Sequence, residues 1–207
     1  MCHQITPLLM EELYGALSGL RSDGHARVGT SSVAPDAYPG STVPLFTVDA
    51  TGELEAQALY WGFEGPTSIG GRLVFNTRLD TALKHLQRRS GMWARPLAEG
   101  RCLVPVRAFY ESWTKRPPSK GAQVRFKLAG HSTFLLAGVK ENNRFSIVTT
   151  EPNEEVGLYH TRMPLVLARG ESSIWLGPDF MDLADRSHVR LTSEVEERPG
   201  AQTSLFG

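Results

Sequence analysis

Four runs of β-forming residues between positions 102 and 150 constrain the fold more than any other part of the chain. They occupy residues 102–113, 122–128, 133–140 and 144–150. Prolines, Gly130 and an Asn-Asn pair separate them, and separations of this kind join neighbouring antiparallel strands. A further hairpin is predicted over residues 42–63, with its turn at 49–52. Together these strands are sufficient to curl into a barrel-like antiparallel sheet.

Short helices are predicted on either side of these strands. Thr6-Pro7 provides an N-cap and a proline for a first turn, and leucines follow at positions 9, 13, 17 and 20, which predicts a helix there. Residues 80–89, 151–159 and 171–176 also predict helices, and residues 73–76 and 164–167 predict short strands. The predicted fold class is therefore α+β, a central antiparallel barrel-like sheet flanked by short helices.

The length and composition fit one domain followed by a tail. The chain has 207 residues, 41% of them hydrophobic, which is enough for one domain with a substantial core. The apolar pattern stops after Leu191, and residues 193–207 are polar and contain glycine and proline. We therefore expect a domain over residues 1–192 and a flexible tail over residues 193–207.

Charge and cysteine content exclude several classes of function. Basic and acidic residues number 22 each, so no overall basic field draws the chain to duplex DNA or anionic lipid. A local patch remains, because residues 72–101 contain seven basic and two acidic side chains and hence a net charge of +5. Cys2 and Cys102 offer neither a disulfide framework nor metal-ligand spacing, and no signal peptide or long apolar run is present. We expect a cytoplasmic protein without a metal or cofactor.

Cys2 is the most reactive candidate in the sequence. Removal of Met1 would leave this cysteine with a free α-amine. A thiol with a pKa of ~8.5 and an amine with a pKa of ~7.7–8.0 would then lie on adjacent carbons. An aldehyde would react with both, first forming a Schiff base and then a five-membered thiazolidine. The alternative is that Cys2 is only a small residue at the start of the first element.

Three polar residues, Asn76, Glu111 and His160, stand at positions where the local pattern favours apolar side chains. Singly, each has an ordinary explanation, as a cap, a solvent-facing strand position or a loop histidine. With Cys2, they supply a proton acceptor, a proton donor and a neutral hydrogen-bond donor, which thiazolidine formation needs. Aromatic neighbours should raise the pKa of the Glu111 carboxyl by desolvation, which suits a proton donor.

Six short motifs along residues 1–168 occur together in one known family. They are Met1-Cys2, Val33-Ala34-Pro35, Trp61-Gly62-Phe63, Asn76-Thr77-Arg78, the segment from Arg101 to Glu111, and His160-Thr161-Arg162-Met163-Pro164. In this order they resemble the SRAP family, named for SOS-response-associated peptidases. The Phe-Tyr-Glu and His-x-Arg-Met-Pro motifs are the most specific of the six.

The resemblance implies a fold with a central barrel-like sheet and an activity, the capping of abasic sites in single-stranded DNA. By motif position, Cys2 would be the crosslinking nucleophile and Asn76 would orient the sugar or the α-amine. Glu111 and His160 would be the acid and base groups. The family's peptidase label implies self-removal of the residue before Cys2. The expected DNA-binding residues are Arg78, Arg72, Arg162 and Trp61.

Three departures from the family pattern weaken the expected grip on DNA. His3-Gln4 stands where the family usually has Gly-Arg, so a phosphate-binding arginine is missing. Glu64-Gly65-Pro66 replaces the usual Ile-Pro-x-Trp, and a lost stacking side chain weakens binding by about 1–3 kcal/mol per base. Ser31-Ser32 replaces the usual Tyr-Asn. The sequence therefore predicts intact chemistry on a weakened DNA surface.

Residues 202–206 resemble the short peptide by which bacterial replication and repair proteins bind the sliding clamp. Gln202, Leu205 and Phe206 would be its anchors. We expect a monomer whose partners are abasic single-stranded DNA and the clamp. Two other functions stay open: an amidohydrolase or peptidase with Cys2 as its N-terminal nucleophile, and a non-catalytic clamp-binding adaptor with a decayed DNA surface.

Overall fold

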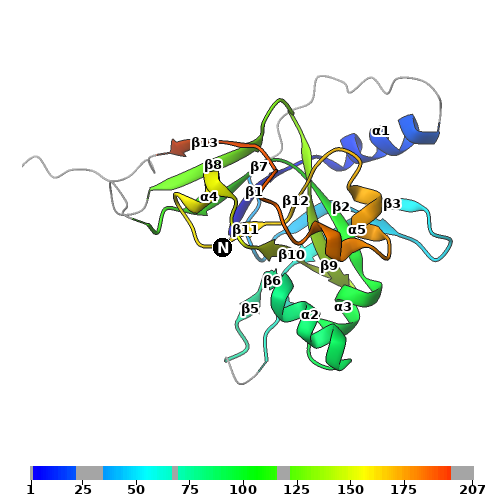
Figure 1. The fold of residues 1–207 in the computed structure, drawn as a ribbon. Coiled ribbons are helices and arrows are strands. Elements are labelled where there is room, and N and C mark those ends of the chain that lie inside the picture. Colours follow the sequence, from blue (N-terminus) through cyan, green and yellow to red (C-terminus); the bar gives the residue numbers. More distant parts are fainter. Residues whose placement is uncertain (1, 22–34, 67–69, 116–121, 197–207) are drawn as a thin grey trace, which may run out of the picture.

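A ring of five hydrogen-bonded strands forms the centre of the fold (Figure 1). The computed structural model describes residues 2–21, 35–66, 70–115 and 122–196. In this part of the chain the ring runs through β9 (Phe134–Glu141), β10 (Arg144–Thr150), β3 (Leu54–Trp61), β2 (Thr42–Val48) and β7 (Arg101–Ser112). It closes because β9 pairs with β7 as well as with β10. The predicted α+β class with a barrel-like sheet is confirmed.

The remaining strands extend this ring. The sheet continues from β7 through β8 (Gln123–Leu128) to β13 (Leu191–Glu196), and from β9 to β12 (Val166–Leu167). The short strand β1 (Gln4–Pro7) pairs with β7, while β6 (Asn76–Arg78) and β11 (Met163–Pro164) pair with β10. A separate pair is formed by β4 (Phe63–Glu64) and β5 (Leu73–Val74).

The helices are short and lie outside the ring. They are α1 (Met10–Arg21), α2 (Leu79–Arg88), α3 (Ala94–Glu99), α4 (Glu154–Gly157), α5 (Ser172–Leu176) and the 3-10 helix η2 (Phe180–Leu183). In Figure 1, α2 and α3 lie together at the bottom of the molecule, and α1 lies at the opposite end. Among the described residues, no helix has both the length and the apolar character needed to cross a membrane.

Two strand pairings are parallel, whereas the sequence predicted an antiparallel sheet. Strand β10 runs parallel to β3, with Phe145 opposite Trp61, and parallel to β6, with Ile147 opposite Asn76. The hairpins β2–β3 and β9–β10 follow their turn residues as predicted. Local turn signals cannot specify the parallel contacts, because these form between segments far apart in the chain.

Aromatic side chains from several strands fill the barrel. Trp61 and Phe145 stack with their ring centroids 6.2 Å apart, and Phe109 and Phe126 stack at 5.0 Å. All four side chains are fully buried. A second apolar cluster lies beneath the helices, with Trp93 from the end of the α2–α3 connection and Trp175 from α5 among its members. The first cluster forms the wall against which Cys2 packs.

The first helix begins later than predicted, because Thr6 and Pro7 belong to strand β1. The Thr6 hydroxyl does not cap a helix; it donates to the Asp36 carboxylate at 2.5 Å and lies 3.1 Å from the Tyr110 hydroxyl. Glu12 stabilises the start of α1 instead, since its carboxylate accepts a hydrogen bond from the Leu9 amide at 2.8 Å. Tertiary contacts therefore override the local capping signal.

The predicted boundary between domain and tail at residue 193 is wrong. Strand β13 crosses it and continues to Glu196, pairing with β8 from Leu191 opposite Leu128 to Glu196 opposite Gln123. The strand forms although it shows little apolar alternation, because main-chain hydrogen bonds hold it against β8. The remaining tail and the predicted clamp peptide at residues 202–206 lie outside the described residues, as do Val33 and Ala34.

Replacing Trp61 tests the barrel core. Its side chain is fully buried, and its Nε1 donates a hydrogen bond to the Phe75 carbonyl at 2.9 Å. Trp61→Ala should therefore lower the free energy of unfolding in urea by about 3–5 kcal/mol. Tyr14→Ala is the control, because Tyr14 is 55% exposed and its loss should change stability by less than about 0.5 kcal/mol. Equal effects of the two substitutions would contradict this packing.

Candidate active site

Four separate segments bring the predicted reactive residues together. Pairing of β1 with β7 places Gln4 opposite Tyr110, so Cys2 reaches the end of β7 where Glu111 lies. Pairing of β6 with β10 brings in Asn76, and β11, which follows His160 closely in the chain, pairs with the same strand β10. In Figure 1 the start of the chain lies close to β6. The ring of strands thus assembles a site that spans most of the chain.

Cys2 is enclosed by protein. Its side chain is fully buried, and its thiol donates a long hydrogen bond to the Gln4 carbonyl, with 3.6 Å between sulfur and oxygen. Burial raises the pKa of this thiol far above its ordinary value, and the nearby charge of Glu111 acts in the same direction. The thiol is therefore protonated at neutral pH, and its reaction as a nucleophile needs a proton acceptor.

Asn76 fixes the main chain of Cys2. Its Nδ2 donates a hydrogen bond to the Cys2 carbonyl with an N···O distance of 2.8 Å. The Asn76 Oδ1 is buried and has no hydrogen-bond partner within the described residues. The Asn76 amide therefore holds the main chain of Cys2, and its Oδ1 remains available in the site as a hydrogen-bond acceptor.

Glu111 is a buried carboxyl group near the end of β7. Its side chain is fully buried in the barrel, and desolvation raises the pKa of its carboxyl to about 7, although the positive amino terminus opposes this shift. A group with a pKa near the working pH is populated in both protonation states. Glu111 can therefore both donate and accept a proton at neutral pH.

His160 lies beside Glu111. Its Nδ1 is 3.9 Å from Glu111 Oε2, and the same nitrogen contacts the main chain of Arg162, whose N–H lies 3.1 Å away. Burial lowers the pKa of the His160 imidazole, and the positive amino terminus and His3 act in the same direction. The ring is therefore a neutral base at neutral pH.

His3 is a residue of this site that the motif reasoning did not select. In the sequence, His3 stands out only as a departure from the family pattern. Its Nε2 is buried, and it is close enough to His160 for its charge to contribute to the lowered pKa of that imidazole. The sequence signal that could have identified His3 is its position directly after Cys2, because neighbouring residues at the start of a strand remain close to the same site.

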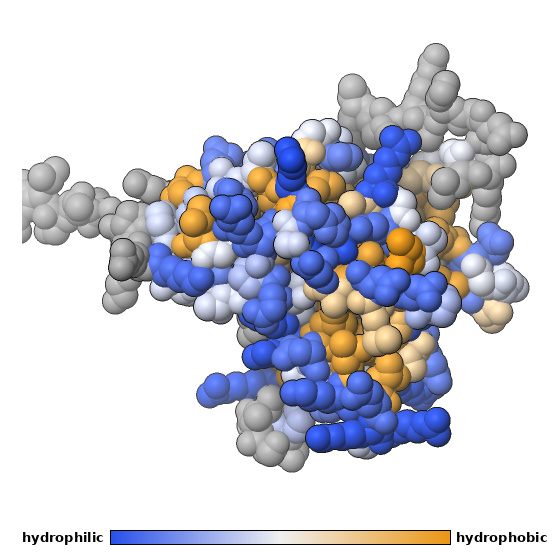
Figure 2. Space-filling view, in the orientation of Figure 1, coloured by the Kyte–Doolittle hydropathy of each residue, from blue (hydrophilic) through white to orange (hydrophobic). Residues whose placement is uncertain are grey.

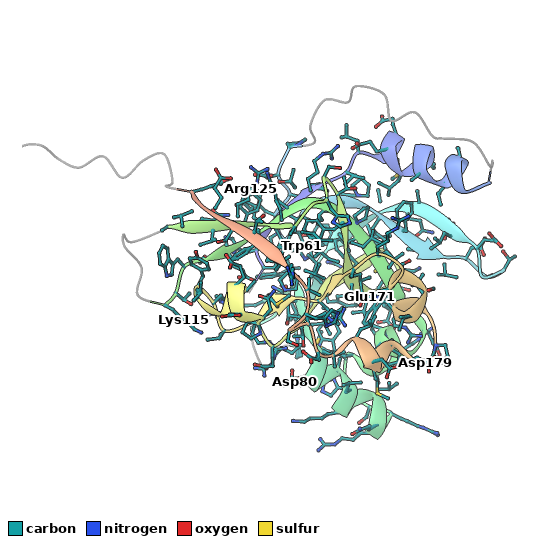
Figure 3. The ribbon with its side chains drawn as sticks, turned by 45° about the horizontal axis from the view of Figure 1, so that its top comes forward. Trp61, Asp80, Lys115, Arg125, Glu171 and Asp179 are labelled. Atoms are coloured by element: carbon teal, nitrogen blue, oxygen red, sulfur yellow. The ribbon has the colours of Figure 1, made fainter. Side chains whose placement is uncertain are left out.

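Two of the predicted DNA contacts are incompatible with the structure. Trp61 is fully buried in the barrel core, in the middle of the molecule in Figure 3, so it has no surface to stack on a base. The Arg162 guanidinium is also buried, and it donates to Glu151, to the Thr149 carbonyl at 2.8 Å and to Asp80 at 3.3 Å. Arg162 holds β10 and the His160 loop together, so a structural role explains its presence in the motif.

Arg78 and Arg72 are exposed, as DNA contacts would have to be. Arg78 is two residues after Asn76, and its guanidinium pairs at 2.9 Å with the carboxylate of Asp80, which is labelled in Figure 3. Of the predicted basic patch, Arg101 is only partly exposed and donates to main-chain carbonyls of α3 and of the end of α5. Figure 2 shows hydrophilic side chains projecting from the lower part of the molecule, where α2 carries the exposed Lys84, Arg88 and, at its end, Arg89.

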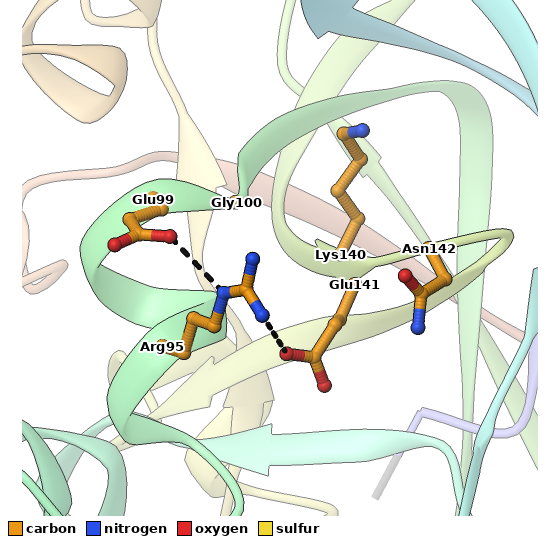
Figure 4. Close-up of a pocket in the computed structure, with 6 residues that line it drawn as sticks. All are labelled: Arg95, Glu99, Gly100, Lys140, Glu141 and Asn142. Atoms are coloured by element: carbon orange, nitrogen blue, oxygen red, sulfur yellow. Dashed lines mark hydrogen bonds and ion pairs between the residues drawn. The ribbon is translucent and has the colours of Figure 1, made fainter.

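A surface pocket of about 140 Å³ lies between α3 and the β9–β10 turn (Figure 4). Its lining does not include Cys2, Asn76, Glu111 or His160. Arg95 is one of its lining residues and is paired with Glu99 at 3.1 Å and with Glu141 at 3.9 Å. Its charge is therefore already compensated. Over the described residues, no three His, Cys, Asp or Glu side chains are grouped so that they could hold a metal ion.

Comparison with known proteins assigns the chain to a family. Residues 11–199 match the family described as SOS response associated peptidase (SRAP), so the chain belongs to the SRAP family. The matched range contains Asn76, Glu111 and His160 and begins after Cys2.

Curated relatives agree with this assignment, and a solved structure shares the fold. The chain is 32% identical over 133 residues to "Abasic site processing protein YoaM" of Bacillus subtilis (strain 168), covering 58% of this chain and 56% of that protein. It is 31% identical over 137 residues to "Abasic site processing protein YoqW" of the same organism, covering 60% and 58%. The match thus spans less than two thirds of either relative.

A crystal structure of a protein from Bacteroides thetaiotaomicron has the same fold, with a TM-score of 0.69, 18% identity and coverage of 95% of this chain and 93% of that chain.

The buried Glu111 carboxyl should make stability depend on pH. In the unfolded chain its pKa returns to about 4.5, whereas burial holds it at about 7 in the folded protein. Below pH 4.5 both states are protonated and stability is unaffected. As the pH rises from 4.5 to 7, the unfolded state loses its proton first, so the folded state loses up to about 3 kcal/mol of stability.

Glu111→Gln removes this ionisation. Relative to the original protein, the variant should therefore gain stability progressively between pH 4.5 and 7, as measured by urea unfolding at several pH values. Glu53→Gln is the control, because Glu53 is exposed and its substitution should leave the pH profile unchanged. Parallel pH profiles for the original protein and Glu111→Gln would show that the carboxyl is not desolvated.

Proposed function

We propose that this protein, acting as a monomer and once Met1 is removed, joins Cys2 covalently to abasic sites in single-stranded DNA. The observation that carries the proposal is that separate segments supply three connected groups: Asn76 binds the main chain of Cys2, Glu111 lies near its thiol, and His160 lies beside Glu111. The names of the relatives, abasic site processing proteins, support the same substrate.

The reaction begins with opening of the abasic sugar. Glu111 in its protonated form donates to the ring oxygen, while the neutral His160 accepts the proton of the sugar hydroxyl, which yields the aldehyde. The free α-amine of Cys2 then attacks the aldehyde carbon. Glu111, ionised by the first step, relays the two amine protons in turn to the carbonyl oxygen, which departs as water. One water leaves, and a C=N bond joins the DNA to the protein.

Closure of the thiazolidine completes the reaction. The Cys2 sulfur adds to the imine carbon, and its proton is transferred to the nitrogen, so this second step is a rearrangement without further loss of atoms. Because burial keeps the thiol protonated, His160 or ionised Glu111 must accept that proton during attack. Asn76 holds the Cys2 carbonyl at 2.8 Å and thereby orients both nucleophiles toward the aldehyde.

Removal of Met1 is assigned to the same groups. Hydrolysis of the Met1–Cys2 peptide bond needs a nucleophile and a proton donor for the departing α-amine, and Cys2 and Glu111 supply these types. This self-processing step would produce the free amine on which the crosslink depends. It would also account for a peptidase label without any external peptide substrate.

The exposed face near Asn76 provides the DNA contact. Arg78 and Arg72 are the side chains proposed to touch phosphate. Glu64 carries a negative charge that would repel phosphate, but it is paired with Arg144 at 2.9 Å, so part of that charge is compensated. Asp80 competes with phosphate for Arg78, which predicts weak, salt-sensitive binding.

Intact mass measurement tests the crosslink. After mixing with single-stranded DNA that carries one abasic site, the protein should lack Met1 and gain the mass of the DNA minus one water. Cys2→Ala should gain nothing, whereas Cys102→Ala, which removes the other buried cysteine, should react like the original protein. Repeated turnover of an amide substrate without an adduct would support the amidohydrolase alternative instead.

A second proposal concerns residues 202–206, whose sequence supports binding to the bacterial sliding clamp through Gln202, Leu205 and Phe206. Replacing Leu205 and Phe206 together by Ala should weaken clamp binding at least about tenfold, because two apolar anchors are lost. Calorimetric titration of the purified clamp with the full chain measures this, and Thr203→Ala is the matched control. Unchanged affinity in the double variant would remove both the clamp proposal and the adaptor alternative.

A further inference from the structure

The outer side of strand β1 is fastened by a network of polar side chains. The Gln4 side chain is nearly buried, and its Nε2 donates to Asp36 Oδ2 at 2.7 Å. The other oxygen of the same carboxylate accepts the Thr6 hydroxyl at 2.5 Å. One carboxylate thus joins two residues of β1 that lie two positions apart on the same face of the strand.

The same glutamine also reaches across the sheet to β8. Gln123 donates its Nε2 hydrogen to Gln4 Oε1, so both ends of the Gln4 amide are used. Backbone hydrogen bonds between Ile5 and Ala37, at 2.8 and 3.0 Å, hold the segment of Asp36 against β1. The strand is therefore fixed on one edge by β7 and on the other by residues 36–37.

The main chain of Gln4 contacts the nucleophile directly. Its carbonyl accepts the hydrogen of the Cys2 thiol, so the position of this carbonyl sets the direction of the S–H bond. A shift of β1 along or across β7 would move the thiol and the α-amine relative to Asn76 and Glu111. Catalytic geometry of this kind is sensitive to displacements of about 1 Å.

We infer that Gln4 is a positioning residue for Cys2, holding β1 in register through Asp36 and Gln123. This inference deepens the proposed crosslinking function and rests on it for its kinetic test. It also gives a role to the position at which a phosphate-binding arginine was expected: the Gln4 side chain is engaged in the protein and is not directed to DNA.

Reversal of one hydrogen bond tests the inference. Gln4→Glu places a carboxylate against Asp36, so a donor is lost and two like charges face each other within about 3 Å. Adding Asp36→Asn restores a donor on the opposite side: the new amide can donate to the introduced carboxylate, keep the bond from Thr6, and leave the Gln123 bond intact. The double exchange changes the direction of the bond and preserves the network.

The measured quantities are the maximal rate of crosslinking, the DNA concentration for half-maximal rate and the thermal midpoint. Gln4→Glu should lower the maximal rate about tenfold, and the double exchange should return it to within about threefold of the original, because the geometry depends on these bonds. The half-saturating DNA concentration should stay constant, since Gln4 does not contact DNA. If Gln4→Glu does not fold, Gln4→Met takes its place. Its side chain is of similar size but cannot form these hydrogen bonds, so it should lower the maximal rate in the same way.

Alkylation of Cys2 by iodoacetamide gives a second readout that needs no DNA. The fully buried thiol should react slowly in the original protein, faster in Gln4→Glu, and slowly again in the double exchange, with Cys2→Ala reporting any reaction at Cys102. If the original protein forms no DNA adduct, the proposed function fails while alkylation still decides the role of Gln4. Equal alkylation and crosslinking rates across all variants would overturn the inference, as would failure of the double exchange to restore them.

Discussion

Pairing of the four-residue strand β1 with β7 is the contact on which the site depends. It carries Cys2 from the start of the chain to a fixed place beside Glu111. Ordering this segment has an entropic cost of about 1–2 kcal/mol per residue, which the strand hydrogen bonds and the fully buried Ile5 offset. The Asp36 and Gln123 contacts of Gln4 add to the same attachment from the outer side.

The barrel core and the reactive groups share one physical cause, burial. The apolar interior that stabilises the fold also removes water from Glu111, His160 and Cys2. In each case the uncharged form is favoured, which raises the pKa of the carboxyl and thiol and lowers that of the imidazole. Proton transfers among neutral partners near pH 7 avoid the creation of isolated buried charges. The destabilisation expected from ionised Glu111 is the energetic cost of that arrangement.

Local sequence signals predicted the antiparallel hairpins well, because turn residues act over a few positions. They failed where a distant partner decided the outcome. Thr6 bonds to Asp36 instead of capping a helix, and β13 forms against β8 without a strong apolar alternation. Trp61 and Arg162 belong to recognisable motifs, but a motif does not distinguish a surface contact from a core contact. Only burial of both side chains made that distinction.

The sequence by itself determined the fold class, the family resemblance and the four candidate residues Cys2, Asn76, Glu111 and His160, since each is a polar or reactive residue in a setting that packing alone does not explain. The tertiary structure decided how they act together. It set the 2.8 Å bond from Asn76 to Cys2, the 3.9 Å approach of His160 to Glu111 and the engagement of Gln4 by Asp36 and Gln123. These features depend on distances between residues up to 119 positions apart and on exclusion of water, and neither quantity exists until the ring of strands closes.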